Sequence, residues 1–177
     1  MAGTARPLSA QDQALVLSVH GGRHSPVVNL TDTGDDLAPG FSVGGGLALQ
    51  INPNLAVRTI GTYHRTRYRG ITQAPPDSGA AQYVLGADLQ VGWPGTSAFV
   101  PYVYVGGGAV VTDFDDAARS TSTRAAGRFG VGLNRVGGLG AWFIEVGGLL
   151  YKFRGFELTK MQFDIEARLG FAFAVGL

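Results

Sequence analysis

The sequence predicts an all-β protein, an eight-stranded antiparallel up-and-down transmembrane β-barrel. Apolar residues alternate with small or polar residues along eight segments, as in strands that have one apolar face. Short turns and long polar connections alternate between these segments, which is typical of a meander of hairpins. The face opposite the apolar residues is rich in glycine and alanine and carries isolated charges of both signs, which suits the narrow interior of a small barrel.

The composition indicates one folded domain. The chain has 177 residues, of which 45% are hydrophobic and 15% are charged, and it contains 28 glycines and no cysteine. It is therefore long enough for a single small barrel, and it has neither a disulfide framework nor a thiolate metal site. The net charge of +1 is too small to indicate nucleic acid as a partner.

We expect residues 1–13 to form an N-terminal tail and residues 14–177 to form a single barrel domain. The tail has no apolar core like that of a complete secretory signal, yet its PLSAQDQ segment resembles a signal cleavage site. Two interpretations stay open for it, the remnant of an export-signal region and a disordered cytosolic tail.

The first half of the barrel is expected to contain four strands. About residues 14–22 form the apolar stretch that begins the domain, and about 39–51 alternate apolar residues with small ones. About residues 55–65 follow an NPN turn. About residues 80–93 carry an apolar residue at every second position. Each pattern predicts a strand with one apolar face.

The second half is expected to contain four more strands. About residues 99–112 carry valine and tyrosine in both registers, so the sequence leaves the outward face of this strand open. About residues 125–136 place aromatic and aliphatic residues opposite arginine, glycine and asparagine. The last two strands, about 141–153 and 161–176, alternate in the same way.

The connections differ in length at the two ends of the barrel. Three of them are short and contain turn residues, at 52–54, 94–97 and 137–140. The other connections are long and polar, at about 23–38, 65–79, 113–124 and 154–160. The sequence therefore predicts one end with tight turns and one end with extended loops.

Two kinds of barrel fit this pattern, because the apolar face can point inward or outward. A soluble ligand-binding barrel would enclose the apolar face, and a membrane barrel would expose it to lipid. The polar face lacks the Lys, Glu and Thr surface usual for a soluble sheet, which favours the membrane barrel. Its charged residues are then expected to pair as a lumen ion network: Arg58, Asp88, Arg128, Glu145, Asp164, Glu166 and Arg168.

Aromatic residues near the strand ends indicate two membrane interfaces. Trp93 and Trp142 flank short turns at one end. A second girdle is expected toward the loop end, made of Tyr63, Tyr83, Tyr151, Phe153 and Phe163. In hydrocarbon every backbone polar group must be paired, and closure into a barrel achieves this for a sheet.

The chain resembles the small outer-membrane β-barrel proteins of Gram-negative bacteria, the group around outer membrane proteins A and X. The resemblance covers residues 14–177 and rests on the architecture, the PYVYVGGG stretch and the last strand. In this family the last strand carries the signal read by the barrel-assembly machinery. The matching residues here are Arg168, Gly170, Phe173 and Val175, although Gly176-Leu177 replaces the usual final aromatic.

Candidate catalytic residues lie on the first strand. Ser18 and His20 share one face, and the neighbouring last strand brings Glu166 or Asp164 within expected reach. A serine, histidine and carboxylate set is suited to acyl hydrolysis, as in outer-membrane lipases. The alternative is a hydrogen-bonded lumen network, which the absence of any local lipase signature favours.

Basic residues at the loop end are candidates for binding anions. Arg65, Arg67 and Arg69 could hold lipopolysaccharide phosphates, or could belong to a solvated loop. No metal or cofactor is expected, because His24 and His64 are isolated in the sequence and show no metal-ligand spacing.

Two glycine runs, 44–46 and 106–108, lie inside expected strands. Crowding in the lumen explains the inward half of each run. The outward half is a candidate smooth patch for a partner protein or a lipid.

These observations predict an integral outer-membrane barrel with a structural, adhesive or accessory-subunit role and no enzymatic activity. The long loops are expected outside the cell and the N-terminus in the periplasm. Expected partners are outer-membrane lipid and lipopolysaccharide, the assembly machinery and a larger envelope complex. A narrow channel gated by the lumen ion pairs and a lipid-modifying acyl hydrolase are the alternatives.

Overall fold

The computed structural model describes residues 15–28, 36–69, 78–95, 98–115, 121–137, 140–155 and 158–175. The expected tail, residues 1–13, lies outside these ranges. The strands are β1 (Leu15–Pro26), β2 (Asp36–Leu37), β3 (Gly40–Asn52), β4 (Leu55–Arg69), β5 (Gly79–Gly92), β6 (Phe99–Phe114), β7 (Ser122–Gly137), β8 (Gly140–Gly155) and β9 (Leu158–Val175).

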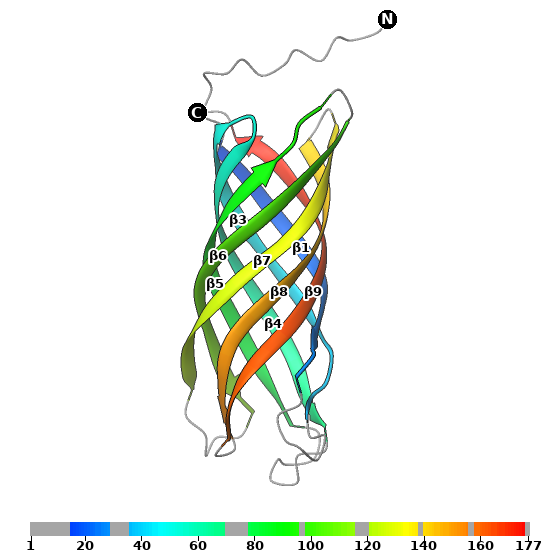
Figure 1. Ribbon diagram of the computed structural model, residues 1–177. Helices are drawn as coiled ribbons and strands as arrows, with labels where there is room; N and C mark the ends of the chain where they lie inside the picture. The colour runs from blue at the N-terminus through cyan, green and yellow to red at the C-terminus, as the bar shows by residue number, and fades with distance from the viewer. Residues whose placement is uncertain are drawn as a thin grey trace, which may run out of the picture.

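Eight long strands close into an antiparallel barrel (Figure 1). The two-residue β2 is added beside β4. Each long strand pairs with its neighbours along the chain. Closure comes from β1 and β9, which pair from Leu15–Val175 to Pro26–Asp164. The predicted fold class, an eight-stranded up-and-down barrel, is confirmed. The described residues contain no helix long and apolar enough to cross a membrane.

The strands run further toward the loop end than the sequence predicted. Strand β1 continues to Pro26 and β4 continues to Arg69. The apolar alternation ends near residue 65, but hydrogen-bonded pairing continues, since Arg67 pairs with Gly79 and Arg69 with Asp36. A ladder needs paired backbone groups, and its outward side chains need to be apolar only where they face an apolar medium.

Outward and inward positions alternate as expected. Leu85, Val105 and Leu169 are among the most exposed apolar side chains, at 58–61%. Asp88 and Arg168 are buried, each with 2% of its surface exposed. The barrel therefore has an apolar outer wall and a lumen that contains charged side chains, which is the reverse of a soluble sheet.

The inward face of β6, left open by the sequence, carries Tyr102 and Tyr104, and both are buried. Glycines on neighbouring strands make room for these rings. A Cβ atom at Gly132 would collide with the Tyr102 ring, and one at Gly147 would collide with the Tyr104 hydroxyl group. The lumen is thus packed by large aromatic side chains opposite residues without side chains.

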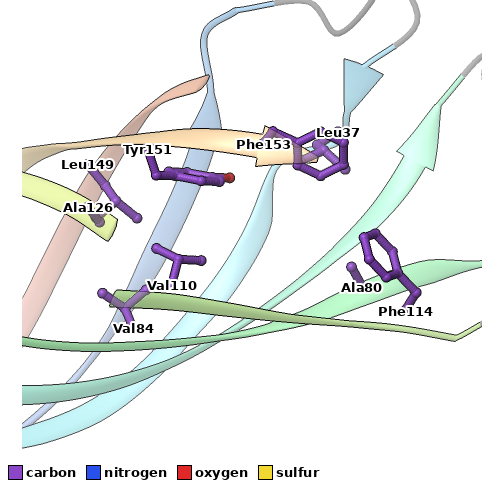
Figure 2. Close-up of a cluster of buried hydrophobic side chains, with 9 residues drawn as sticks. All are labelled: Leu37, Ala80, Val84, Val110, Phe114, Ala126, Leu149, Tyr151 and Phe153. Atoms are coloured by element: carbon purple, nitrogen blue, oxygen red, sulfur yellow. The ribbon is translucent and has the colours of Figure 1, made fainter. Parts of the chain in front are cut away.

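The loop end of the lumen is filled by an apolar cluster, shown in Figure 2. It consists of Leu37, Ala80, Val84, Val110, Phe114, Ala126, Leu149, Tyr151 and Phe153. Two of these residues correct the sequence analysis. Tyr151 and Phe153 were expected in an outward girdle, but they are buried with 2% exposed because β8 points its odd-numbered residues inward. The outward residues beside them on β8 are Leu150 and Lys152.

Candidate functional site

A network of buried charges crosses the middle of the lumen. At its centre the Glu145 carboxylate lies between two guanidinium groups. Arg58 Nη1 donates to Glu145 Oε1, and Arg168 Nη2 lies 2.8 Å from Glu145 Oε2. Tyr102 also donates to Glu145 Oε1, at 2.8 Å. Glu145 therefore holds strands β4, β6, β8 and β9 together from inside the barrel.

A second carboxylate, Asp88 on β5, extends the network. Asp88 Oδ2 lies 3.0 Å from Arg58 Nη2 and 3.0 Å from Arg128 Nη1. Arg58 is thus shared between Asp88 and Glu145. A set of shared charge-assisted hydrogen bonds of this kind compensates the desolvation of each member.

The Tyr104 ring packs against the arginines of this network. The guanidinium carbons of Arg58, Arg128 and Arg168 lie 4.7, 5.8 and 5.9 Å from its centroid. Its hydroxyl oxygen accepts a hydrogen bond from Arg168 Nη2 at 2.9 Å. Sequence analysis missed Tyr102 and Tyr104 because tyrosine and valine alternate on β6 with a similar apolar character.

Two histidines that are far apart in the sequence meet in the lumen. The rings of His24 on β1 and His64 on β4 stack with centroids 4.7 Å apart. His64 Nε2 lies 2.7 Å from Glu166 Oε1, and His24 Nε2 lies 3.4 Å from Asp164 Oδ2. The expectation that these histidines are isolated is wrong, since closure of the barrel brings β1, β4 and β9 to one level.

His24, His64, Asp164 and Glu166 form a histidine cluster, which hydrogen bonds from neutral side chains complete. Tyr151 and Gln162 donate to the Asp164 carboxylate at 3.1 and 3.0 Å, and Gln82 donates to Tyr151 at 3.0 Å. This cluster adjoins the apolar cluster at the loop end, because Tyr151 belongs to both.

All seven charges predicted for the lumen are buried. The structure brings six of them into one continuous network, which reaches Glu166 through Arg168 at 3.8 Å. Asp164 instead pairs with His24 in the histidine cluster. The seven residues comprise three guanidinium groups and four carboxylates.

Ser18 and His20 share the inward face of β1, but their hydrogen bonds go elsewhere. Ser18 Oγ donates to the Gly46 carbonyl oxygen at 3.3 Å, and His20 Nε2 is 3.1 Å from Thr62 Oγ1. Glu166 and Asp164, the candidate orienting carboxylates, lie against His64 and His24. The predicted catalytic set is therefore not assembled in this arrangement.

The remaining interfacial aromatics point outward. Trp93 and Trp142 are exposed at the turn end, and Trp142 packs edge-on against Phe171 with centroids 5.0 Å apart. Toward the loop end, the rings of Tyr63 and Tyr83 lie 5.4 Å apart. The structure adds further outward aromatic residues: Phe41 toward the loop end, Phe129 near the middle, and Phe99, Phe171 and Phe173 toward the turn end.

The three arginines at the loop end of β4 differ in their contacts. Arg65 forms a two-pronged ion pair with Asp115, with Nη–Oδ distances of 2.8 and 2.7 Å. This hydrogen-bonded pair lowers the pKa of the Asp115 carboxyl, and the Gly79 amide donates to the same carboxylate. Arg67 and Arg69 are exposed. Arg65 is thus occupied within the protein, and Arg67 is exposed on the same face.

The predicted assembly signal lies along β9. Arg168 and Gly170 face the lumen, where Arg168 joins the ion network and a Cβ atom at Gly170 would collide with the Phe143 ring. Phe173 and Val175 are on the outward face. Gly176 and Leu177 lie outside the described residues.

The part of the chain that the structure describes contains no group of three or more His, Cys, Asp or Glu residues arranged to hold a metal ion. The side chains at the centre of the lumen are instead arranged as ion pairs and hydrogen bonds with each other.

Several solved structures share this fold. Neisserial surface protein A is 14% identical, with 91% of this chain and 97% of that chain covered and a TM-score of 0.64. Outer membrane protein AlkL, solved in lipid bilayers, is 19% identical over 100% of this chain and 97% of its own, with a TM-score of 0.58. Outer membrane protein OprG from Pseudomonas aeruginosa is 13% identical, with 96% of this chain and 100% of that chain covered and a TM-score of 0.54.

No protein-family model and no curated protein matches the sequence. At these identities the likeness establishes the fold, which is that of the small eight-stranded outer-membrane β-barrels. The family resemblance inferred from the sequence is confirmed at this level.

Proposed function

We propose that the protein is an integral outer-membrane barrel whose lumen is sealed, with a non-enzymatic structural, adhesive or accessory-subunit role in the envelope. The observation that carries this proposal is the contrast between the two faces of the wall. The outward face exposes large apolar side chains, while the lumen buries paired charges and an apolar cluster. An apolar outer wall is stable against lipid, and the charges inside the barrel are stabilised by their ion pairs.

The outward face of β9 supports a membrane-spanning position. From Phe163 to Phe173 its outward residues are aromatic, aliphatic or alanine. Ten residues of strand span about 33 Å at about 3.3 Å per residue. With a tilt of about 40°, this corresponds to about 25 Å along the barrel axis, which is the height of the apolar band of outer-membrane barrels.

The charges on the outer surface support an orientation with the loops outside the cell. Basic side chains project outward near the loop end: Arg23, Arg65, Arg67, Arg69, Lys152 and Arg154. Such a rim suits the phosphate groups of lipopolysaccharide, the expected lipid partner. In this orientation the N-terminus is periplasmic, because β1 begins at the turn end opposite Val175. Assembly by the barrel-assembly machinery, through the β9 signal, belongs to the same proposal.

Membrane fractionation and a heat-dependent mobility shift test this proposal. The protein is extracted from cells in detergent and run on a gel with and without boiling. We expect it in the outer-membrane fraction, with the folded and unfolded forms migrating differently. A monomer that is soluble in buffer and shows no shift would contradict the proposal and would favour a soluble barrel.

A narrow gated channel is the second candidate, and one observation favours it. Glu145 is shared by Arg58 and Arg168, and Arg58 is shared by Glu145 and Asp88, so the pairs have alternative partners within reach. An exchange of partners would be needed to open a path. Discrete conductance steps in planar bilayers that change with Arg128→Gln would support the channel over the sealed lumen.

A further inference from the structure

The outer wall of the barrel is hollowed by an apolar groove that crosses β1, β3, β4 and β5. The groove has a volume of about 600 Å³. Leu17, Val19, Leu47 and Leu85 are among its lining residues. It lies within the band of outward apolar residues, so its mouth opens toward the surrounding hydrocarbon in the orientation proposed above.

Two outward glycines form the floor of this groove. Gly45 and Gly61 pair directly across β3 and β4, and Gly45 also pairs with Val19 on β1. A Cβ atom at Gly45 would lie 2.7 Å from the Ser18 carbonyl oxygen, so the backbone itself requires glycine there. At Gly61 a Cβ atom would lie 3.5 Å from Leu85 Cδ2, which is an ordinary contact. The space above Gly61 is therefore free to be filled.

Cationic side chains lie above the groove on the same strands. Arg23 is four residues from Val19 on β1, and Arg65 is four residues from Gly61 on β4, so both lie about 13 Å further along their strands toward the loop end. Arg65 is paired with Asp115. Arg23 is exposed and has no ion-pair partner within the described ranges, and the same holds for Arg67. Free guanidinium groups thus lie at the headgroup end of an apolar groove.

We propose that this groove is a binding site for one lipid A molecule, with one acyl chain over Gly61 and a phosphate held by Arg23 and Arg67. This inference rests on the proposed function, because it requires a lipid-facing wall with the loop end in the lipopolysaccharide leaflet. An amphiphile matches both halves of the site, since the groove accepts an acyl chain and the guanidinium groups accept a phosphate by charge-assisted hydrogen bonds.

Binding of purified lipid A to the delipidated, detergent-solubilised barrel tests the site, measured by native mass spectrometry. Gly61→Leu fills the groove and is expected to weaken binding by about tenfold, as the loss of about 1.4 kcal/mol of chain contact implies. Gly127→Leu is the matched control, because Gly127 faces outward on β7 with no atom within 4 Å of an added Cβ. It is expected to bind lipid A as the native protein does.

A second pair of variants tests the phosphate contact. Arg23→Gln is expected to weaken binding of lipid A by about three- to tenfold, since it removes one charge-assisted contact. Arg135→Gln, which removes an outward charge at the turn end of β7, is expected to leave binding unchanged.

Three outcomes would overturn the lipid site. They are equal binding by Gly61→Leu and Gly127→Leu, equal binding by Arg23→Gln and Arg135→Gln, and tighter binding of phosphatidylglycerol than of lipid A. Each variant is first checked for the heat-dependent mobility shift, so that only folded barrels are compared. If the native protein is absent from the outer-membrane fraction, or shows no heat-dependent mobility shift, the proposed function itself is contradicted. If it passes both tests but the variants and their controls bind lipid A equally, only the lipid site is contradicted.

Discussion

The middle and the loop end of the lumen are both filled with side chains, but in different ways. In the middle, three arginines form ion pairs with their carboxylate partners around the Tyr104 ring. At the loop end, aliphatic and aromatic side chains pack together, with Leu37 of β2 fully buried among them. The stability of the middle of the lumen depends on the pairing of its charges, and the stability of the loop end depends on how well side chains fill its volume.

This difference predicts different responses to substitution. Loss of one partner in the middle leaves another charge buried and uncompensated, whatever the size of the new side chain. Loss of a side chain at the loop end leaves a cavity, and the cost follows the volume removed. The variants below test this contrast through the free energy of unfolding in lipid vesicles, measured with urea.

The largest effect is expected for Glu145→Gln. The amide keeps the volume but removes the negative charge shared by Arg58 and Arg168. We expect the free energy of unfolding to fall by about 3–5 kcal/mol. Asp113→Asn makes the same chemical change on the exposed surface and is expected to cost less than about 0.5 kcal/mol. Equal costs for the two variants would show that the buried charge is not needed.

The next effect is expected at the apolar cluster, where two adjacent leucines face opposite sides. Leu149 is fully buried in the lumen, and Leu150 is 42% exposed on the outer wall. We expect Leu149→Ala to cost about 3–4 kcal/mol, because it removes apolar contacts and leaves a cavity. Leu150→Ala is expected to cost about 1–2 kcal/mol, because lipid chains can fill the space. A larger cost for Leu150→Ala would contradict the assignment of the two faces.

A smaller effect is expected in the histidine cluster, at the boundary between the two regions. His64→Gln replaces the imidazole that lies 2.7 Å from Glu166 and also removes the ring stacked on His24. We expect a loss of about 1.5–3 kcal/mol, the range for a hydrogen bond to a charged group. His20→Gln is the control, because His20 bonds to the neutral Thr62 hydroxyl, and its cost is expected to be lower.

The smallest effect is expected outside the lumen, at Arg65 and Asp115. The hydrogen bond from Arg65 lowers the pKa of Asp115 below its usual value of 3.8. The pair's contribution to stability is therefore present above about pH 4 and is lost as the pH falls through the lowered pKa. Because the pair is exposed, we expect less than about 1 kcal/mol. Asp115→Asn should remove this part of the pH dependence of the free energy of unfolding. An unchanged pH profile in this variant would contradict a stabilising role for the Arg65–Asp115 pair.

Much of the fold could be predicted from the sequence because alternation and turn residues are local signals. The outward and inward faces of β9 follow directly from Phe163, Asp164 and the residues after them. Strand ends beyond the apolar band were missed, since the side chains near Arg67 and Arg69 no longer alternate in polarity as apolar-band residues do.

The lumen site could be predicted in part. Isolated charges on the small-residue face identified the ion network, because a buried charge needs a partner. The stacking of His24 on His64 could not be predicted, since it depends on which strands lie opposite one another after closure. Tyr151 and Phe153 were placed outward because aromatic character alone does not distinguish a lumen cluster from an interfacial girdle.

Single-channel recording of the purified barrel in planar bilayers tests the central claim most directly. A sealed lumen predicts insertion without discrete conductance, both for the native protein and for Gly127→Leu. Steady discrete conductance of the native protein, altered by Arg128→Gln, would contradict the account and would make the ion network a gate.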